Sequence, residues 1–353
     1  MKLLFCGLGS IGQRHLRNVR TLLGDSVEVL AWRSRGTSPV LNADMTVRAG
    51  AELEQTYNLR SFAKLEAALA EKPDAVFITN PNTLHLPVAL AAAKAGCHLF
   101  VEKPISHSMD GMAELIAEVE HRRLTALVAY QFRFHPGLQK VKACLTQGGL
   151  GKLAAAQVVN AEYLPDWHRY EDYRGTHPAR RELGGGCLRI QTHELDYVLW
   201  LFGLPKKVFA VGGHLSGLEV NVEDSVGLLL EYPRPGGGAL PVYVHLDYLQ
   251  RPPQRSCEIV GDAGRLRYDY YANQIEFHEL AQPAPRIERF DGFKRENMFL
   301  DELRHFFACI EGREQPVVDL REGCRSMAIA AAASRSLESG RAELVEEFLP
   351  HRQ

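Results

Sequence analysis

The residues with the clearest chemical meaning stand near the start of the chain, in a turn with the spacing Gly7-x-Gly9-x-x-Gly12. The turn follows an apolar run, residues 3–6, and precedes a segment with helical periodicity, residues 11–23. In that context the first glycine permits the tight turn, the second lets a pyrophosphate approach the backbone, and the third lets helix and strand pack closely. The pyrophosphate then lies on free N–H groups at the positive end of the helix. The turn predicts a dinucleotide site whose phosphate contacts are Gly7, Gly9, Ser10, Ile11 and Gly12.

A basic segment at the end of the second predicted strand, residues 27–32, bears on the choice of dinucleotide. In this kind of unit a carboxylate about 20 residues beyond the glycines binds the ribose hydroxyls of NAD. This chain instead has Arg33, Ser34 and Arg35, two guanidiniums and a hydroxyl that suit the 2′-phosphate of NADP. The alternative is a solvated basic loop in which Arg33 stacks on the adenine. The segment favours NADP and leaves NAD open.

The elements that must position this turn alternate regularly over the first third of the chain. Buried strands are expected at residues 3–6, 27–32, 74–79, 98–101 and 126–130, and helices at residues 11–23, 60–71, 84–95 and 108–122. Strands that alternate with helices in this way predict a doubly wound parallel sheet. We therefore expect a dinucleotide-binding Rossmann domain over residues 1–130.

The pattern changes after about residue 150, where strand-like segments follow one another with short connections rich in Gly, Pro and Asn. They cover residues 153–163, 206–214, 224–232, 239–249, 256–261, 265–270 and 274–279. This order predicts one large, mainly antiparallel sheet. Helices at 193–202 and 296–311 are expected to cover one face of it, and a helix near 321–339 to pack back toward the first domain. The fold class is thus α/β followed by an α+β domain over residues 131–353.

Further polar segments lie at the carboxyl ends of the predicted parallel strands, where open α/β sheets bind ligands. They are Thr79-Asn80-Pro81-Asn82-x-x-His85, Glu102-Lys103-Pro104 and Gln131-Phe132-Arg133, followed by Gly184-Gly185-Gly186 and His193-Glu194-Leu195-Asp196. In this order, over nearly the whole chain, they resemble the glucose–fructose oxidoreductase/inositol dehydrogenase (Gfo/Idh/MocA) family. The resemblance implies a nicotinamide-dependent enzyme that moves a hydride to or from a carbohydrate. The cofactor contacts that it implies are Thr79, Asn80, Pro81, Asn82, His85, Glu102, Lys103, Gln131 and Arg133.

The resemblance also implies the catalytic pair. Taken alone, Lys103 would be an ordinary surface lysine, and His193 a residue satisfied by the backbone at a helix start. Beside a nicotinamide, Lys103 can hydrogen-bond a substrate hydroxyl and stabilise negative charge that develops on its oxygen. His193 can take or return the hydroxyl proton. Asp196, one helical turn further on, could orient the imidazole.

One departure from the family pattern bears on this chemistry. Family members often carry an aspartate, close to the lysine and the histidine, in the strand between the glycine triplet and the histidine. Here residues 187–192 contain no carboxylate, and Ile190 stands at the expected place, or Arg189 if the register slips by one. Without that acid, Lys103 and His193 lose a partner that would tune their protonation. We favour an enzyme that works with Lys and His alone.

A segment rich in aromatic and charged residues, 163–174, is the candidate substrate loop. Its aromatic residues Tyr163 and Trp167 can stack on a sugar ring, Asp172 can accept from hydroxyls, and Arg174 can clamp a carboxylate or phosphate. The density of charge favours an anionic substrate, such as a sugar acid or a nucleotide sugar. A solvated loop between domains or subunits is the alternative. With Lys103 and His193, these four residues form the predicted substrate site.

The composition of the chain excludes several other classes of protein. The net charge is −2 over 353 residues, so no long-range field favours nucleic acid or an anionic membrane. The seven cysteines form no C-x-x-C pair, which argues against a disulfide framework or a metal site. With no run of about 18 apolar residues and no signal-peptide cleavage site, we expect a cytoplasmic protein.

Two other functions remain open at this point, and so does the assembly. One is a lyase-like or hydrolase-like enzyme that oxidises and then re-reduces a glycoside or anhydro-sugar on a retained NAD. The other is a dinucleotide-sensing or sugar-sensing regulator without activity, for which the missing aspartate is the main support. The resemblance further implies a homodimer or homotetramer formed through the second sheet.

Overall fold

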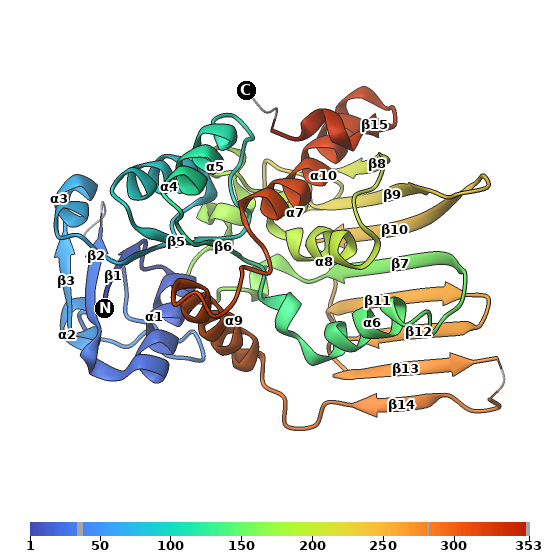
Figure 1. The fold of residues 1–353 in the computed structure, drawn as a ribbon, viewed down its shortest axis with the longest axis horizontal. Coiled ribbons are helices and arrows are strands. Elements are labelled where there is room, and N and C mark those ends of the chain that lie inside the picture. The colour runs from blue at the N-terminus through green and yellow to red at the C-terminus, as the bar shows by residue number, and fades with distance from the viewer. Residues whose placement is uncertain (34–37, 281, 351–353) are drawn as a thin grey trace.

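The computed structural model describes residues 1–33, 38–280 and 282–350, which form two sheets that lie side by side (Figure 1). The first sheet is parallel, with the strand order β3-β2-β1-β4-β5-β6. Its strands are β1 (Lys2–Cys6), β2 (Glu28–Trp32), β3 (Leu59–Phe62), β4 (Ala75–Ile78), β5 (His98–Glu102) and β6 (Ala126–Ala129). The helices that connect them are α1 (Ser10–Leu23), α2 (Leu53–Tyr57), α3 (Leu65–Ala70), α4 (His85–Lys94) and α5 (Met112–His121).

Both faces of this parallel sheet are buried, which explains why its strands are continuous apolar runs. Along β1, Leu4 and Cys6 pack into one hydrophobic cluster, whereas Leu3 and Phe5 pack into another on the opposite face. The carboxyl ends of the strands therefore all emerge at one edge, with the glycine turn after β1. This is the doubly wound sheet that the sequence predicted.

The second sheet has the strand order β14-β13-β12-β11-β7-β10-β9-β8-β15 and is antiparallel except for the parallel pair β7 and β10. Its strands are β7 (Leu153–Ala161), β8 (Lys207–Gly213), β9 (Ser225–Pro233), β10 (Ala239–Asp247), β11 (Gln254–Gly261), β12 (Gly264–Asp269), β13 (Gln274–Glu279), β14 (Arg286–Arg289) and β15 (Glu343–Leu344). Helices α6 (Pro136–Thr146), α7 (Cys187–Ile190) and α8 (Thr192–Phe202) lie in front of it in Figure 1. The predicted large, mainly antiparallel sheet is confirmed.

The helix α9 (Arg295–Ile310) corrects one prediction, because Leu303, Phe306 and Phe307 pack into the core of the parallel sheet, whereas Met298, in its first turns, packs into the core of the second sheet. Its Phe306 ring lies 5.8 Å from the ring of Phe77 in β4 and 5.3 Å from that of Phe100 in β5. An apolar stripe at helical spacing indicates that one side of a helix is buried, but it does not indicate which sheet that side contacts. Placing α9 on the second sheet was therefore wrong.

Two short segments also differ from prediction. Residues 60–71, predicted as one helix, form the edge strand β3 followed by the helix α3. Residues 187–190, expected in a strand, form the short helix α7. A run of four residues is too short for its periodicity to distinguish strand from helix.

The helix α10 (Leu320–Ser339) joins the two halves of the molecule. Leu320, Cys324 and Met327 pack into the core of the parallel sheet, whereas residues 328–333 pack into the core of the second sheet. Gly323 permits the first contact, since a Cβ there would lie 2.8 Å from the Cγ2 of Val128 in β6.

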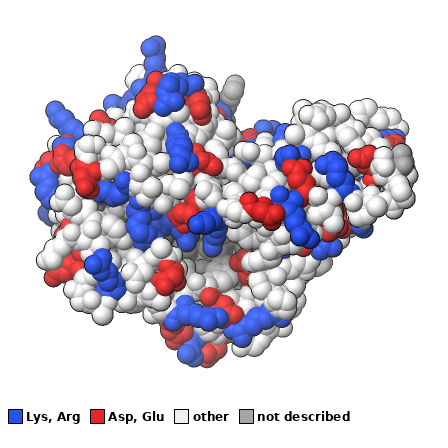
Figure 2. All heavy atoms as spheres, turned by 90° about the horizontal axis from the view of Figure 1, so that it is seen from below, with Lys and Arg blue, Asp and Glu red and all other residues white. Residues whose placement is uncertain are grey.

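Seen from below, the molecule has two lobes with a hollow between them, bordered by both basic and acidic side chains (Figure 2). Within the described ranges, no helix is long and apolar enough to cross a membrane. The same ranges contain no group of His, Cys, Asp and Glu that could hold a metal ion.

Candidate active site

The glycine turn after β1 is shaped by contacts that exclude side chains. Gly7 has a φ of +107°, and a Cβ on it would lie 2.7 Å from the backbone nitrogen of Asn80. A Cβ on Gly12 would lie 2.2 Å from the carbonyl oxygen of Gly7, which accepts a 2.5 Å hydrogen bond from Thr79 Oγ1. Gly9 differs, because no described atom lies within 4 Å of where its Cβ would be. Protein packing thus requires the first and third glycines, whereas the second leaves open space.

That open space fits a dinucleotide phosphate. The helix α1 begins at Ser10, and no side chain of the described residues caps its first turn. Its first N–H groups are therefore available to an anion at the positive helix end. Both amide atoms of Asn80, at the end of β4, are buried without a hydrogen-bond partner among the described residues. Such atoms need a polar ligand, and the residues present fit the cofactor that the glycine turn predicts.

At the end of β2, Arg33 forms an ion pair with Glu54 of α2. Ser61 donates a 2.6 Å hydrogen bond to the same carboxylate. This bond, together with Arg33, lowers the pKa of Glu54 from its ordinary value. Ser34 and Arg35, also predicted to contact the cofactor, lie outside the described residues. Glu54 could not be predicted from the sequence, because its place beside Arg33 depends on the packing of α2 over β2 and β3.

Lys103 directly follows β5, and its Nζ donates a 2.8 Å hydrogen bond to the carbonyl oxygen of Ile190. Burial lowers the pKa of Lys103, Glu102 and Glu194 oppose that shift, and Arg255 adds to it. The position where a carboxylate was expected therefore does contact Lys103, through its main chain. The amine is half-buried, although taken alone its sequence position suggested an exposed one.

His193 lies in the first turn of α8 and is buried. Its Nε2 lies 3.3 Å from the side-chain amide nitrogen of Gln131, and its Nδ1 has no partner among the described residues. Burial, followed by the charges of Lys103 and Arg255, holds the pKa of His193 well below its ordinary value. The imidazole is consequently neutral near pH 7 and able to accept a proton from a bound hydroxyl.

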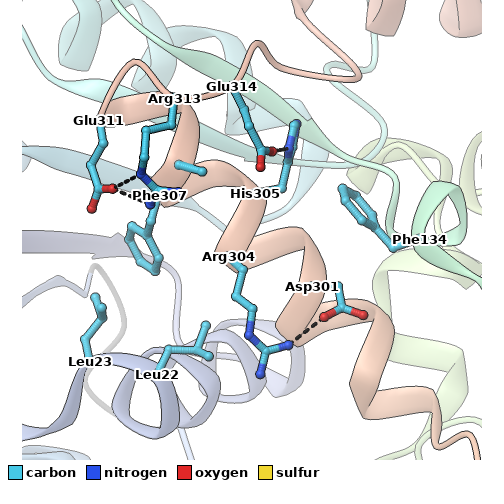
Figure 3. A pocket seen from close by; sticks show the side chains of 11 residues that line it. Leu22, Leu23, Phe134, Asp301, Arg304, His305, Phe307, Glu311, Arg313 and Glu314 are labelled. Carbon is cyan, nitrogen blue, oxygen red and sulfur yellow. Dashed lines mark hydrogen bonds and ion pairs between the residues drawn. The ribbon is translucent and has the colours of Figure 1, made fainter.

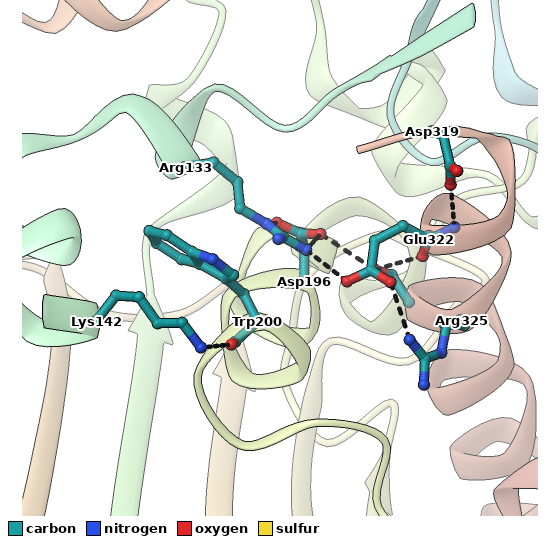
Figure 4. Close-up of polar contacts among 8 residues, drawn as sticks. Arg133, Lys142, Asp196, Trp200, Asp319, Glu322 and Arg325 are labelled. Atoms are coloured by element: carbon teal, nitrogen blue, oxygen red, sulfur yellow. Dashed lines mark hydrogen bonds and ion pairs between the residues drawn. The ribbon is translucent and has the colours of Figure 1, made fainter. Parts of the chain in front are cut away.

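Asp196 does not orient His193, so that prediction is wrong. Its two carboxylate oxygens accept 2.8 Å hydrogen bonds from Nε and Nη2 of Arg133 (Figure 4). Arg133 also donates to Glu322 of α10 at 3.1 Å, and its guanidinium lies over the ring of Trp200. An aspartate three residues after a histidine faces the same side of a helix. Here Asp196 instead binds Arg133, whose guanidinium pairs with both carboxylate oxygens. Arg133 thus joins β6, α8 and α10.

The other predicted cofactor residues hold the loops around the turn. His85 places its ring nitrogens 2.9 Å from the carbonyl oxygen of Pro104 and 2.8 Å from that of Asn80. Glu102 lies 2.6 Å from the ring of His15 and accepts from the backbone nitrogen of Lys103 at 3.1 Å. Pro81 precedes a 3₁₀ turn, Asn82–Leu84, whose Asn82 donates to the carbonyl oxygen of Gly184 at 3.1 Å.

The four residues predicted in the substrate loop contact neighbouring side chains of the protein. Tyr163 lies 3.9 Å beneath the guanidinium of Arg251, and Trp167 meets the ring of Tyr248 edge-on at 5.3 Å. Arg174 is paired with Asp172 at 2.9 Å and with Glu219 at 2.6 Å. Among the contacts of the described residues, none joins these four to Lys103 or His193. Their part in substrate binding stays a prediction.

A buried ion pair next to Lys103 and His193 was not predicted from the sequence. Arg255 of β11 binds both oxygens of Glu194, at 2.7 and 3.0 Å, and its guanidinium lies 3.9 Å from the ring centre of Phe132. Asn160 of β7 donates to the same carboxylate at 2.9 Å. A signal was present, since Arg255 directly precedes a predicted strand of the sheet and Glu194 directly follows His193. The pairing itself depends on the register of β11 with β7.

A cavity of about 590 Å³ between α1 and α9 contains none of the predicted site residues (Figure 3). Its charged side chains are paired with one another: Asp301 with Arg304, Glu311 with Arg313, and Glu314 with His305. A wall whose charges are already neutralised offers a ligand no unsatisfied group. The candidate site is therefore the edge of the parallel sheet, where the glycine turn, Lys103 and His193 meet.

Comparison with known proteins agrees with this geometry. Residues 1–130 match the family model described as "Oxidoreductase family, NAD-binding Rossmann fold", and residues 142–345 match "Oxidoreductase family, C-terminal alpha/beta domain". The chain belongs to the Gfo/Idh/MocA oxidoreductase family. Its two matched regions cover all strands of the parallel sheet and all strands of the second sheet.

The chain is similar to several characterised members. Myo-inositol 2-dehydrogenase of Thermotoga maritima is 24% identical over an alignment of 356 positions that covers 99% of this chain and 100% of that protein. The 2,7-anhydro-N-acetylneuraminate hydratase of Escherichia coli is 28% identical over 178 residues, 49% of this chain and 46% of that one. The crystal structure of the WlbA dehydrogenase from Bordetella pertussis, in complex with NADH and UDP-GlcNAcA, superposes with a TM-score of 0.79 at 24% identity, over 98% and 97% of the chains. The last likeness supports the fold.

Behind the site lies Glu302 of α9, a fully buried carboxyl group whose two oxygens have no partner among the described residues. Burial, and then the nearby charges of Glu102 and Asp196, hold its pKa well above the ordinary value. A glutamate with a raised pKa in the folded state keeps its proton there but loses it in the unfolded chain. Its contribution to stability is therefore complete below the ordinary pKa of glutamate and is lost as pH rises toward the folded-state pKa.

We expect Glu302→Gln to remove this pH dependence. Relative to wild type, the free energy of unfolding of the variant should increase between pH 5 and pH 8, by up to about 1.4 kcal/mol per pH unit. Thermal or urea unfolding across that range measures the difference. Glu338→Gln, at an exposed position of α10, is the control and should give a constant difference. Parallel curves for Glu302→Gln and wild type would contradict the account.

Proposed function

We propose that this protein is an NAD(P)-dependent oxidoreductase that acts on a hydroxyl or carbonyl carbon of a sugar, sugar acid or nucleotide sugar. The dinucleotide, when bound, supplies the hydride acceptor or donor. The observation that carries the proposal is the placement of Lys103 and His193. A half-buried amine and a buried neutral imidazole come together at the sheet edge that also holds the phosphate turn.

Lys103 has the role of binding and polarising the reacting oxygen. An ammonium has three donors, and only the one to Ile190 is used within the described residues. The remaining donors can bind a substrate oxygen and stabilise the negative charge that develops on it. The fixed carbonyl of Ile190 orients the amine without holding it charged as strongly as an aspartate would, which suits an enzyme that works with lysine and histidine alone.

His193 has the role of acid and base. Its neutral ring accepts the hydroxyl proton during oxidation and returns it during reduction. Gln131 lies against Nε2 and fixes the ring. The positive charge of Arg295, which acts on both Lys103 and His193, favours a substrate that carries a negative charge, whereas that of Arg255 is already paired with Glu194.

A second candidate is an enzyme that oxidises and re-reduces its substrate on a retained dinucleotide, with elimination or hydration between the two steps. The similarity to 2,7-anhydro-N-acetylneuraminate hydratase favours it. A cofactor that survives purification, together with turnover that releases no reduced dinucleotide, would distinguish it from a simple dehydrogenase. A regulator without activity is disfavoured by the intact Lys103 and His193.

The first test is Lys103→Met, which keeps the length of the side chain and removes its donors. Turnover should fall by about 100- to 10,000-fold, while the dissociation constant of NAD(H) or NADP(H) changes little. The assay follows dinucleotide absorbance with myo-inositol, 2,7-anhydro-N-acetylneuraminate and UDP-GlcNAcA, which the names of the related proteins suggest. Lys64→Met, at an exposed position, is the control. Undiminished turnover by Lys103→Met would refute the mechanism.

The second test concerns the dinucleotide, for which we propose NADP. Glu54 already binds Nη1 of Arg33 and would compete with a 2′-phosphate for that donor. Exchanging both Arg33 and Arg35 for alanine should raise the KM for NADPH much more than that for NADH, whereas Glu54→Gln should lower the KM for NADPH. Steady-state kinetics with both cofactors measure this. If the variant without these two arginines had unchanged KM values for NADPH and NADH, the segment would not determine cofactor preference.

The third test concerns assembly, because one face of the second sheet is apolar and exposed. Phe209, Leu229 and Tyr243 are 38%, 40% and 48% exposed and lie opposite one another in β8, β9 and β10. We propose that a second copy of the chain covers this row, in a homodimer or homotetramer. Leu229→Asp should lower the mass seen by analytical ultracentrifugation, whereas Leu215→Asp, in the exposed β8–β9 connection, should not. A wild-type monomer, or an unchanged mass for Leu229→Asp, would contradict this.

A further inference from the structure

The segment between β7 and the glycine triplet covers the site at two points. Burial raises the pKa of Tyr170 to about 12, the charge of Glu171 adds to the shift, and the hydroxyl of Ser10 opposes it. Tyr170 therefore lies close to the phosphate turn. Burial lowers the pKa of His177, and the charges of Lys103 and His85 add to that shift, so this histidine lies within electrostatic range of the lysine. One segment thus reaches from the cofactor end of the site to its substrate end.

The glycine triplet explains how His177 comes so close. A Cβ on Gly185 would lie 2.5 Å from the carbonyl oxygen of His177 and 2.6 Å from that of Pro178. Gly186 donates a 3.1 Å backbone hydrogen bond to Pro178. On the other side, Gly184 is held by Asn82 of the first domain. Without side chains, the triplet lets the backbone at His177 pack directly against the loop that leads to Ile190, the hydrogen-bond partner of Lys103.

The imidazole ring of His177 lacks hydrogen-bond partners in the part of the chain that the structure describes. Neither of its nitrogens has a hydrogen-bond partner among the described residues, and Nε2 is buried. Burial, followed by the charge of Lys103, lowers the pKa of His177 to about 4. The ring is neutral near pH 7 and therefore offers one donor and one acceptor. That pair matches a hydroxyl group, which both donates and accepts, better than it matches a carboxylate or a phosphate. A buried ring nitrogen without a partner is costly unless a ligand completes it.

We propose that His177 is a substrate-binding residue that hydrogen-bonds a second hydroxyl of the sugar, beside the oxygen that Lys103 and His193 serve. The inference rests on the proposed function and deepens it. Residues 187–192 supply no carboxylate to anchor a neighbouring hydroxyl, and His177 provides the anchor from the other side of the triplet. By fixing two oxygens at once, Lys103 and His177 determine which carbon of the sugar is presented for reaction.

The test compares His177→Phe, which keeps a ring and removes both nitrogens, with His177→Asn, which restores a donor and an acceptor on a shorter side chain. For whichever of myo-inositol, 2,7-anhydro-N-acetylneuraminate and UDP-GlcNAcA the enzyme turns over, His177→Phe should raise KM by about 10- to 100-fold. The change in kcat should be smaller, the NADH dissociation constant should stay within about twofold, and His177→Asn should recover part of the loss. His121→Phe, at the exposed end of α5, is the control for introducing a phenylalanine.

Binding of the same three sugars to the enzyme–NADH complex, followed by thermal shift, separates this proposal from the proposed function. Turnover by wild type reports on the function, whereas the difference between wild type and His177→Phe in sugar binding reports on His177. An unchanged sugar affinity in His177→Phe would overturn the inference, and so would an equal loss of NADH binding. If none of the three sugars stabilises wild type, both proposals fail.

Discussion

The amine of Lys103 is half-buried at the carboxyl edge of a parallel sheet, with a main-chain carbonyl as its hydrogen-bond partner. Taking an ammonium out of water is costly unless nearby negative charge compensates for it. Two carboxylates do so here, Glu102 beside it in the chain and Glu194 in α8. Each is held in turn, Glu102 by His15 of α1 and Glu194 by Arg255 of β11. The lysine is thus supported from both halves of the molecule.

The compensation of buried charge also requires that the two sheets keep a fixed position relative to each other. Arg133 follows β6 of the first sheet, yet its carboxylate partners come from α8 and α10. A buried arginine with both partners in place is well satisfied, whereas removal of either partner would leave an uncompensated charge. Because α10 also fills the cores of both sheets, His193 at the start of α8 is positioned against Lys103 by packing as well as by charge.

Much of the fold could be read from the sequence because local patterns determine it. The strands of the parallel sheet are apolar runs, and the glycine spacing is typical of a turn between a buried strand and a helix. The sequence could not place α9, because an apolar stripe does not name the surface that it meets. For the same reason it could not show that Asp196 pairs with Arg133, or that Glu54 and Glu194 compensate Arg33 and Arg255. Those pairs join residues far apart in the chain, and only the packed structure decides among the available partners.

The central claim is that the phosphate turn and the pair Lys103 and His193 belong to a single hydride-transfer site. A crystal structure of the wild-type protein soaked with NADPH or NADH tests this most directly. The account predicts the pyrophosphate on the backbone N–H groups of Ser10, Ile11 and Gly12, and the nicotinamide in contact with Lys103 and His193. A dinucleotide bound away from the glycine turn, or one whose nicotinamide lies away from both side chains, would contradict it.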